Sequence, residues 1–370
     1  MAGKDSSDRS LRIASMTTML DYHWMFLRTL SSAVREYLGE AGLAALERGF
    51  RRAGYYRGQR IRDRPETFAE GRDALALIRH WDMGEHAMAA ETGPFEVSGS
   101  AAQATLTFPH VPGADYFSTH PGGEILEPYW RNTLAGIAEG YDASAGVECS
   151  AVTVDLNTPW QLTWTYRGES EEVTAGPPED VFAQPARAIQ LTRSTFAVFA
   201  VMQMYVGFEL IDRFDASGER ALREALYQFG VERGQGMREQ ALSQGRPLDF
   251  QSWFEVLQER DPAESVFVFR GDTRISPGVM QAECTYCPLA EVWSEEGERG
   301  LKLGYMYDVE VHRGLVESYH PGGRIGWNTV KTRGDRTCKF HFSIPDLVTA
   351  DDPDWAQPRR TKPGQAQPKS

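Results

Sequence analysis

The residues best suited to chemistry are concentrated between Glu283 and Phe342. This stretch holds three of the four cysteines, together with acidic residues and histidines. Such side chains can act as nucleophiles, acids, bases or metal ligands. They are Cys284, Cys287, Asp308, His312, Glu317, Cys338 and His341. We therefore expect any catalytic chemistry of the protein to lie in this stretch.

Cys284 is the candidate nucleophile, because a thiolate can attack an electrophilic C=N or C=O carbon. A thiol with an ordinary pKa of about 8.5 needs a nearby base or positive field, and a departing nitrogen needs an acid. Asp308 and His312 suit these roles, because residues four apart in a predicted helix share one face. Cys338 completes the set of candidate catalytic residues. The structural alternative is a buried strand cysteine, a locally paired aspartate and a surface histidine.

A metal site is another interpretation of the cysteines, because Cys284-x-x-Cys287 and Cys338-x-x-His341 form a Cys3His set. The second pair lies in CKFHF, which alternates like a strand, so its two side chains are expected on opposite faces. A zinc knuckle would also need a glycine turn that is missing here. A redox pair would need a helix start after Cys287, and the sequence shows no recognisable one. We therefore expect no metal and no cofactor.

The predicted substrate-binding residues come from the same stretch. Tyrosine hydroxyls at the mouth of an apolar pocket would orient a small polar ligand. A carboxylate on the substrate would need a cation, and Arg333 and Arg324 are the nearest in sequence. Glu317 can share a pocket with Asp308 only if the helix ends between them. The predicted set is Tyr286, Tyr305, Glu317 and Arg333.

Composition and charge narrow the class of protein. Of 370 residues, 41% are hydrophobic and 25% charged, as in soluble globular proteins. A net charge of -13 and the lack of a basic run argue against nucleic acid as a partner. The longest apolar run, Phe196 to Phe208, is shorter than the about 20 residues that span a bilayer. We expect a cytoplasmic protein with a small-molecule substrate and no membrane partner; a homodimer stays open.

The elements that must position these residues occur twice along the chain. The segment from Ala44 matches that from Arg220 at an offset of 176, and Glu127 to Asp142 matches Tyr305 to His320 at an offset of 178. Nearly constant offsets of this kind predict an internal duplication. Each copy is expected to be α+β, with a helical N-terminal part followed by an antiparallel sheet and a packed helix.

The repeat divides the chain into five parts. We expect a disordered tail over 1–12, a first, diverged copy over 13–174, a linker over 175–187, a second copy over 188–346 and a disordered tail over 347–370.

The two copies differ in the residue types that face one another in the alignment. Cys284 falls on Leu106, Asp308 on Trp130, His312 on Leu134 and Cys338 on Trp160. We therefore expect the active site in the second copy, with the first as scaffold or pocket wall. The first copy contains His80, His86, His110 and His120, so a site shared between the copies stays open.

Three short motifs in the second copy point to a known family. They are C-x-Y at Cys284, the helix with Asp308 that leads to Tyr319-x-Pro321, and G-D-x-x-C-x-F-x-F from Gly334 to Phe342. Over about Glu219 to Ile344 the chain resembles the L-2-amino-thiazoline-4-carboxylic acid hydrolase family. Three residues before Asp308, where that family tends to carry a cysteine, this chain has Tyr305.

The resemblance implies a function as well as a fold. Family members open a cyclic amidine, converting a thiazoline ring to a carbamoyl-cysteine. This implies a small-molecule hydrolase, or a related ring-opening or cyclising enzyme, acting on C–N bonds of an amidine-, thiazoline- or amide-like substrate. The alternative is a non-catalytic small-ligand-binding or sensory module on the same fold.

Overall fold

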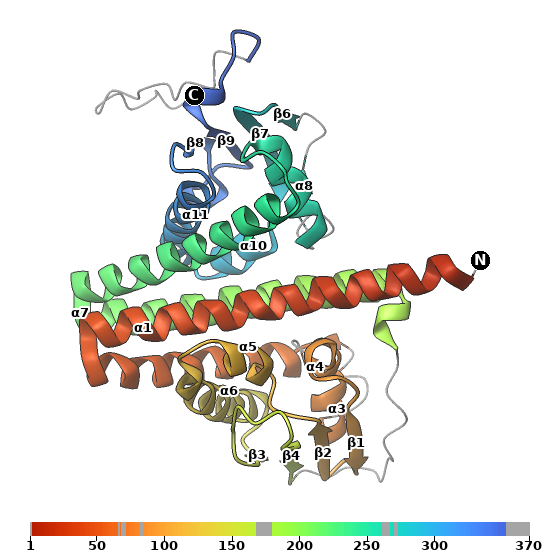
Figure 1. Cartoon of the computed structure of the whole chain (residues 1–370). Coiled ribbons are helices and arrows are strands. Elements are labelled where there is room, and N and C mark those ends of the chain that lie inside the picture. The colour runs from red at the N-terminus through yellow and green to blue at the C-terminus, as the bar shows by residue number, and fades with distance from the viewer. Residues whose placement is uncertain are drawn as a thin grey trace.

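The computed structural model describes residues 2–65, 67, 72–81, 84–167, 180–260, 267–269 and 273–352. Long helices form a central layer, and two antiparallel sheets lie on opposite sides of it (Figure 1). The α+β class expected from the sequence is confirmed.

The first half opens with one long, bent helix and closes with a four-stranded sheet. Its elements are α1 (Ala2–Arg62), α3 (Ala74–Arg79), α4 (Gly84–Thr92), β1 (Glu96–Gly99), β2 (Gln103–Phe108), α5 (Ala114–Thr119), η1 (Gly123–Ile125), α6 (Leu126–Tyr141), β3 (Ala145–Cys149) and β4 (Trp160–Tyr166). The strand order is β1-β2-β4-β3, and every neighbouring pair is antiparallel.

The second half has the same general order of elements. They are η2 (Val181–Ala183), α7 (Pro185–Ser243), α8 (Phe250–Arg260), β5 (Val268–Phe269), β6 (Arg274–Ile275), β7 (Val279–Tyr286), α10 (Pro288–Glu295), α11 (Gly297–Tyr319), β8 (Arg324–Thr329), η3 (Lys331–Arg333), β9 (Cys338–Ser343) and η4 (Pro345–Leu347). The strand order is β5-β7-β9-β8, with β6 also paired to β7.

Each long helix bends at one residue with non-helical backbone angles. In α1 this residue is Gly39, with φ 58° and ψ −151°, and in α7 it is Asp215, with φ 47° and ψ −125°. Glycine adopts this conformation without steric cost, whereas a residue with a Cβ atom is strained there. The two bends lie 176 residues apart, the offset at which the N-terminal segments align.

Close helix packing also recurs in the two halves. A Cβ atom on Gly54 of α1 would lie 2.2 Å from the carbonyl oxygen of Thr133 on α6. A Cβ atom on Gly230 of α7 would likewise lie 2.2 Å from the carbonyl oxygen of Val311 on α11. Both glycines therefore allow a helix backbone to approach its neighbour more closely than any side chain would permit.

A pair of buried tyrosines provides a second shared contact. The Tyr141 hydroxyl donates to the carbonyl of Asp73 at 3.2 Å, and the Tyr319 hydroxyl donates to the carbonyl of Asp249 at 3.0 Å. In each half this bond ties the end of the sheet-covering helix to the start of an earlier helical segment.

The strand registers correct one detail of the predicted alignment. Phe108 lies opposite Trp160 in the first sheet, whereas Cys284 lies opposite Cys338 in the second. Since Leu106 lies opposite Leu162, a single offset of 178 cannot hold for both strands. The registers differ by two residues, which preserves the face on which each side chain points because strand side chains alternate with period two.

The predicted boundaries are corrected at the N-terminus. Helix α1 begins at Ala2, where a disordered tail was expected over 1–12. Within the predicted linker, α7 begins at Pro185, and residues 175–179 lie outside the described residues. At the other end, the predicted tail over 347–370 begins at the last residue of η4, and residues 353–370 lie outside the described residues.

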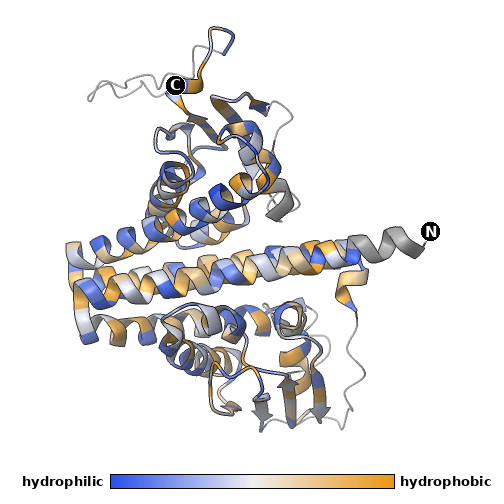
Figure 2. Ribbon diagram, viewed as in Figure 1, coloured by the Kyte–Doolittle hydropathy of each residue, from blue (hydrophilic) through white to orange (hydrophobic). Residues whose placement is uncertain are grey.

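The core is built around the long helices, whose ribbons alternate hydrophobic and hydrophilic residues (Figure 2). Among the described residues, α7 is the one helix long and apolar enough to cross a membrane. Its most apolar window is 83% buried inside the protein, as in the core helix of a soluble protein. That helix is therefore weak support for a membrane span.

Candidate functional site

The second half contains a cavity of about 170 Å³ between α7, α11 and the sheet. All four predicted catalytic residues line it: Cys284 on β7, Asp308 and His312 on α11, and Cys338 on β9. The sheet register sets the two cysteines directly opposite one another, and helical spacing sets Asp308 and His312 on one face. The structure thus brings together residues from three separate elements.

The rest of the cavity wall is mostly apolar and aromatic. Helix α7 contributes three phenylalanines, α8 contributes Trp253 and Leu257, and the sheet contributes further aromatic rings. The phenylalanines of α7 are Phe196, Phe199 and Phe229, and the aromatic residues of the sheet are Phe269, Trp327, Phe340 and Phe342. Two wall residues, Met19 and Tyr22, come from α1 in the first half. The cavity therefore suits a ligand with an apolar body and a few polar groups.

The Cys284 thiol is buried, with 4% of the residue exposed. It donates a hydrogen bond to the carbonyl of Tyr286 at 3.0 Å. Burial raises the pKa of Cys284 to about 12, and the neighbouring Cys338 adds to the effect. Burial also raises the pKa of Cys338 to about 11, although its sulfur accepts the backbone N–H of Lys331 at 3.3 Å. Both thiols are protonated at neutral pH, so a nucleophilic role requires a base.

The Asp308 carboxyl lines the same cavity and is the carboxyl group among its wall residues. It is 8% exposed, and its Oδ2 accepts a hydrogen bond from the Thr332 hydroxyl at 2.5 Å. Burial raises the pKa of Asp308 to about 7, and the bond from Thr332 opposes that rise. A carboxyl with a pKa near neutrality can both accept and return a proton at working pH.

The His312 ring is held in one tautomer. Its Nδ1 lies 2.8 Å from the backbone carbonyl oxygen of Asp308, and a carbonyl can only accept, so Nδ1 carries the proton. The ring packs edge-on against Trp327, with ring centroids 5.2 Å apart. Burial lowers the pKa of His312 to about 4, with the positive charge of Arg233 acting in the same direction. His312 is therefore neutral, with an unprotonated Nε2.

Arg233 is a cationic residue of the cavity wall, whereas the sequence analysis pointed to Arg333 and Arg324. It lies on α7, lines the cavity, and its guanidinium carbon lies 4.3 Å from the ring centre of Tyr22. The signal available in the sequence was its position between Gly230 and Gly234, on the segment of α7 that packs closely against α11.

The predicted substrate-binding residues lie outside the cavity lining. Glu317 is exposed and accepts the Tyr227 hydroxyl at 3.0 Å, because α11 continues unbroken from Gly297 to Tyr319 and turns Glu317 away from Asp308. Arg333 is exposed and stacks over Tyr305 at 5.8 Å. The Tyr286 ring is covered by Arg193 at 5.4 Å. Closeness in sequence to the motifs was a poor guide to position in space.

Cys287, which is not among the predicted catalytic residues, also lines the cavity, and burial raises its pKa well above the ordinary value. Helix α10 begins at Pro288, directly after Cys287, where the sequence showed no recognisable helix start. His341 is buried in β9 and packs over Gly326, where a Cβ atom would lie 2.3 Å from its Nε2. It is not among the cavity residues, and neither are His80, His110 and His120 of the first half; the His86 side chain lies outside the described residues. Within the described ranges no group of three or more His, Cys, Asp or Glu could hold a metal ion.

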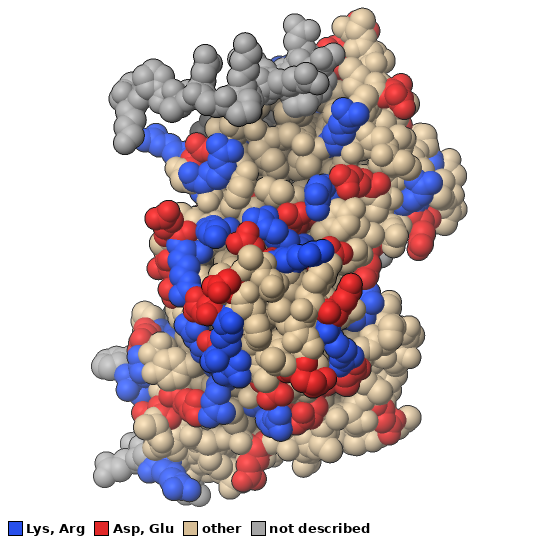
Figure 3. Space-filling model, turned by 90° about the vertical axis from the view of Figure 1, so that its left-hand side faces the viewer, with Lys and Arg blue, Asp and Glu red and all other residues tan. Residues whose placement is uncertain are grey.

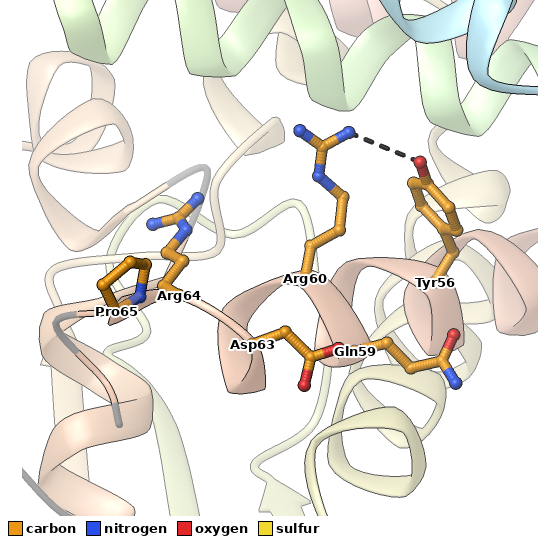
Figure 4. Close-up of a pocket in the computed structure, with 6 residues that line it drawn as sticks. All are labelled: Tyr56, Gln59, Arg60, Asp63, Arg64 and Pro65. Carbon is orange, nitrogen blue, oxygen red and sulfur yellow. Dashed lines mark hydrogen bonds between the residues drawn. The ribbon is translucent and has the colours of Figure 1, made fainter. Parts of the chain in front are cut away.

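A second hollow lies beside the end of α1 and is lined mostly by polar side chains (Figure 4). There Arg60 pairs with Glu295 at 2.9 Å, and Arg64 donates to the carbonyl of His80 at 2.7 Å. On the face shown in Figure 3, basic and acidic side chains are likewise interspersed. The pair of Arg60 and Glu295 joins α1 to α10 of the second half, and the residues that line this hollow include no cysteine, histidine or serine.

The fold and the lining together define an α+β protein with a mostly apolar cavity in its second half. Residues 196–342 match the model of the L-2-amino-thiazoline-4-carboxylic acid hydrolase family, so the predicted resemblance of the second half is confirmed. The match includes Arg233 and all four candidate catalytic residues, and it leaves out α1. No curated protein and no solved structure matches this chain.

Proposed function

We propose that the protein is a small-molecule hydrolase, or a related ring-opening or cyclising enzyme, acting on an amidine-, thiazoline- or amide-like substrate in this cavity. The observation that carries the proposal is that Cys284, Asp308 and His312 face one cavity within the segment that matches a hydrolase family. The substrate class comes from the family description, which names a thiazoline carboxylic acid.

The proposed reaction begins with attack by Cys284. Its sulfur bonds to the amidine carbon of the substrate while its proton moves to the Asp308 carboxylate. Because the pKa of this thiol is about 12, little thiolate exists beforehand, so attack and proton transfer occur together. The bond from that carbon to a ring heteroatom then breaks, and Asp308 returns the proton to the departing atom.

Water completes the reaction. His312 accepts a hydrogen bond from water at Nε2 and orients its oxygen toward the carbon held by Cys284. The water oxygen bonds to that carbon, the carbon–sulfur bond breaks, and the thiol recovers a proton from the water. The net change is addition of one water molecule across the opened ring bond. Arg233 would pair with a carboxylate on the substrate.

Substitution of the two central residues tests this mechanism. Cys284→Ser and Asp308→Asn should each lower turnover of 2-aminothiazoline-4-carboxylate, or of a cyclic amidine found by screening, at least tenfold. Circular dichroism should show an intact fold in both variants. Full activity in both would remove the proposed roles.

A non-catalytic binding or sensory module is the second candidate, favoured by the apolar wall and by the high pKa of Cys284. Reaction of the thiol with iodoacetamide separates the two. Rapid alkylation that a ligand prevents would favour the enzyme, whereas an inert thiol together with tight ligand binding would favour the module.

We also propose that the chain is internally duplicated and acts in the cytoplasm. The equivalent bends at Gly39 and Asp215, and the shared contacts of Gly54 and Gly230, support the duplication. In this proposal the second copy holds the chemistry, while the first serves as scaffold and supplies part of the pocket wall.

A further inference from the structure

Helix α1 contributes to a cavity that otherwise belongs to the second half. Met19 and Tyr22 line this cavity, although they lie far outside residues 196–342, the segment that matches the family. In Figure 1, α1 runs beside α7 through the central layer of the molecule. The second half therefore does not close its own cavity, and part of the ligand surface belongs to α1.

Tyr22 contacts the cation of the cavity directly. The Arg233 guanidinium carbon lies 4.3 Å from the centre of the Tyr22 ring and 5.4 Å from that of Phe229. These two rings pack edge to face, with centroids 6.3 Å apart. Aromatic faces attract a guanidinium through their quadrupoles and leave its positive charge in place. Tyr22 thus restricts where Arg233 lies without neutralising it.

The size of the cavity limits the ligand. An apolar cavity of about 150 Å³ accommodates benzene. The present cavity of about 170 Å³ therefore fits one ring with a small substituent. Phe196, Phe199 and Phe229 provide apolar surface for the ring, on the helix that also carries Arg233.

We propose that α1 completes the binding site, with Tyr22 as a positioning residue that holds Arg233 against the acidic group of a single-ring anion. The ring of that ligand lies among Met19 and the phenylalanines of α7. This inference deepens the proposed function and rests on it for the use of this cavity as the substrate site.

Binding of two probes of the same shape tests the inference in the full-length protein. Benzoate carries the acidic group, and benzamide is its neutral counterpart. Titration calorimetry should show benzoate binding at least tenfold more tightly than benzamide, and Arg233→Met should abolish this preference. Tyr22→Leu should reduce the preference at least threefold, whereas Tyr22→Phe should retain it because phenylalanine keeps the aromatic face.

Tyr37 provides a matched control. The Arg220 guanidinium lies 4.9 Å over the Tyr37 ring, a pair that also joins α7 to α1 but does not line the cavity. Tyr37→Leu should therefore leave the preference unchanged. If Tyr22→Leu fails to fold, Tyr22→Met replaces it, with the same loss expected.

Three results would overturn the inference: equal binding of the two probes, no binding of either, or equal preferences in the Tyr22→Leu and Tyr37→Leu proteins. The probes are not hydrolysed, so the outcome is independent of turnover. A protein that hydrolyses a cyclic amidine but does not prefer benzoate would retain the proposed function and lose this inference. A protein that prefers benzoate but opens no ring would retain the role of Tyr22 and Arg233 in binding and lose the proposed hydrolase function.

Discussion

The two halves place a helix over a sheet in the same way, yet they fill the space between them differently. In the first half Trp130 of α6 and Trp160 of β4 are fully buried, with ring centroids 5.2 Å apart. In the second half the aligned positions hold Asp308 and Cys338, and a cavity lies beside them. One arrangement of elements thus supports either a filled core or a binding site, depending on a few large side chains.

This difference has an energetic consequence. Buried tryptophan rings fill the first core, and close packing of this kind favours dispersion contacts. The second core gives up some of those contacts and buries a carboxyl whose pKa is raised to about 7. Sites that bind and react commonly sacrifice stability in this manner. We therefore expect the core of the first half to contribute more to the stability of the molecule than the core of the second half, which contains the candidate site.

Opening the first core gives the largest expected effect on stability. Trp130→Ala removes a fully buried ring whose Nε1 donates to the carbonyl of Pro112 at 3.1 Å. The free energy of unfolding should fall by about 3–5 kcal/mol, measured by urea denaturation. Turnover of the protein that remains folded should be unchanged, because the reactive residues lie in the second half. A tenfold loss of turnover in folded protein would mean that the halves are not separate in function.

Removing the buried charge of the second core should instead raise the free energy of unfolding. The pKa of Asp308 is raised when folded, so the unfolded chain ionises at a lower pH and stability falls as pH rises from about 4 to about 7. Asp308→Asn removes this penalty and can still accept the Thr332 hydroxyl. At pH 8 the variant should be more stable than wild type by on the order of 4 kcal/mol, and the difference should vanish near pH 4. A variant that is less stable at pH 8 would contradict the assignment.

The pH dependence of turnover addresses the same carboxyl. If the Asp308 carboxylate accepts the Cys284 proton, kcat/KM should rise with pH with an apparent pKa near 7. This corresponds to roughly a tenfold increase between pH 6 and pH 8. A profile that falls over this range would instead make protonated Asp308 the required form.

Much of the site could be predicted because its signals are local. Asp308 and His312 follow helical spacing, and Cys284 and Cys338 lie in two short strand motifs that happen to pair. The contribution of Tyr22 could not be predicted in this way. It reaches the cavity through the packing of α1 against α7, a contact between distant parts of the chain that no short spacing encodes.

The smallest expected effect compares the bends of the two long helices. Asp215 adopts φ 47° and ψ −125°, a conformation that strains residues with a Cβ atom, whereas Gly39 occupies the equivalent bend. Asp215→Gly should therefore raise the free energy of unfolding, because it relieves the backbone strain in the folded protein. The greater entropy of glycine in the unfolded chain offsets part of this gain, so the net increase should be about 1 kcal/mol. Gly39→Ala should lower it by a similar amount, since a Cβ atom there meets no neighbour and only backbone strain changes. Thermal denaturation gives the melting temperature of each variant relative to wild type. Changes of the same sign in the two variants would mean that the two bends are not equivalent.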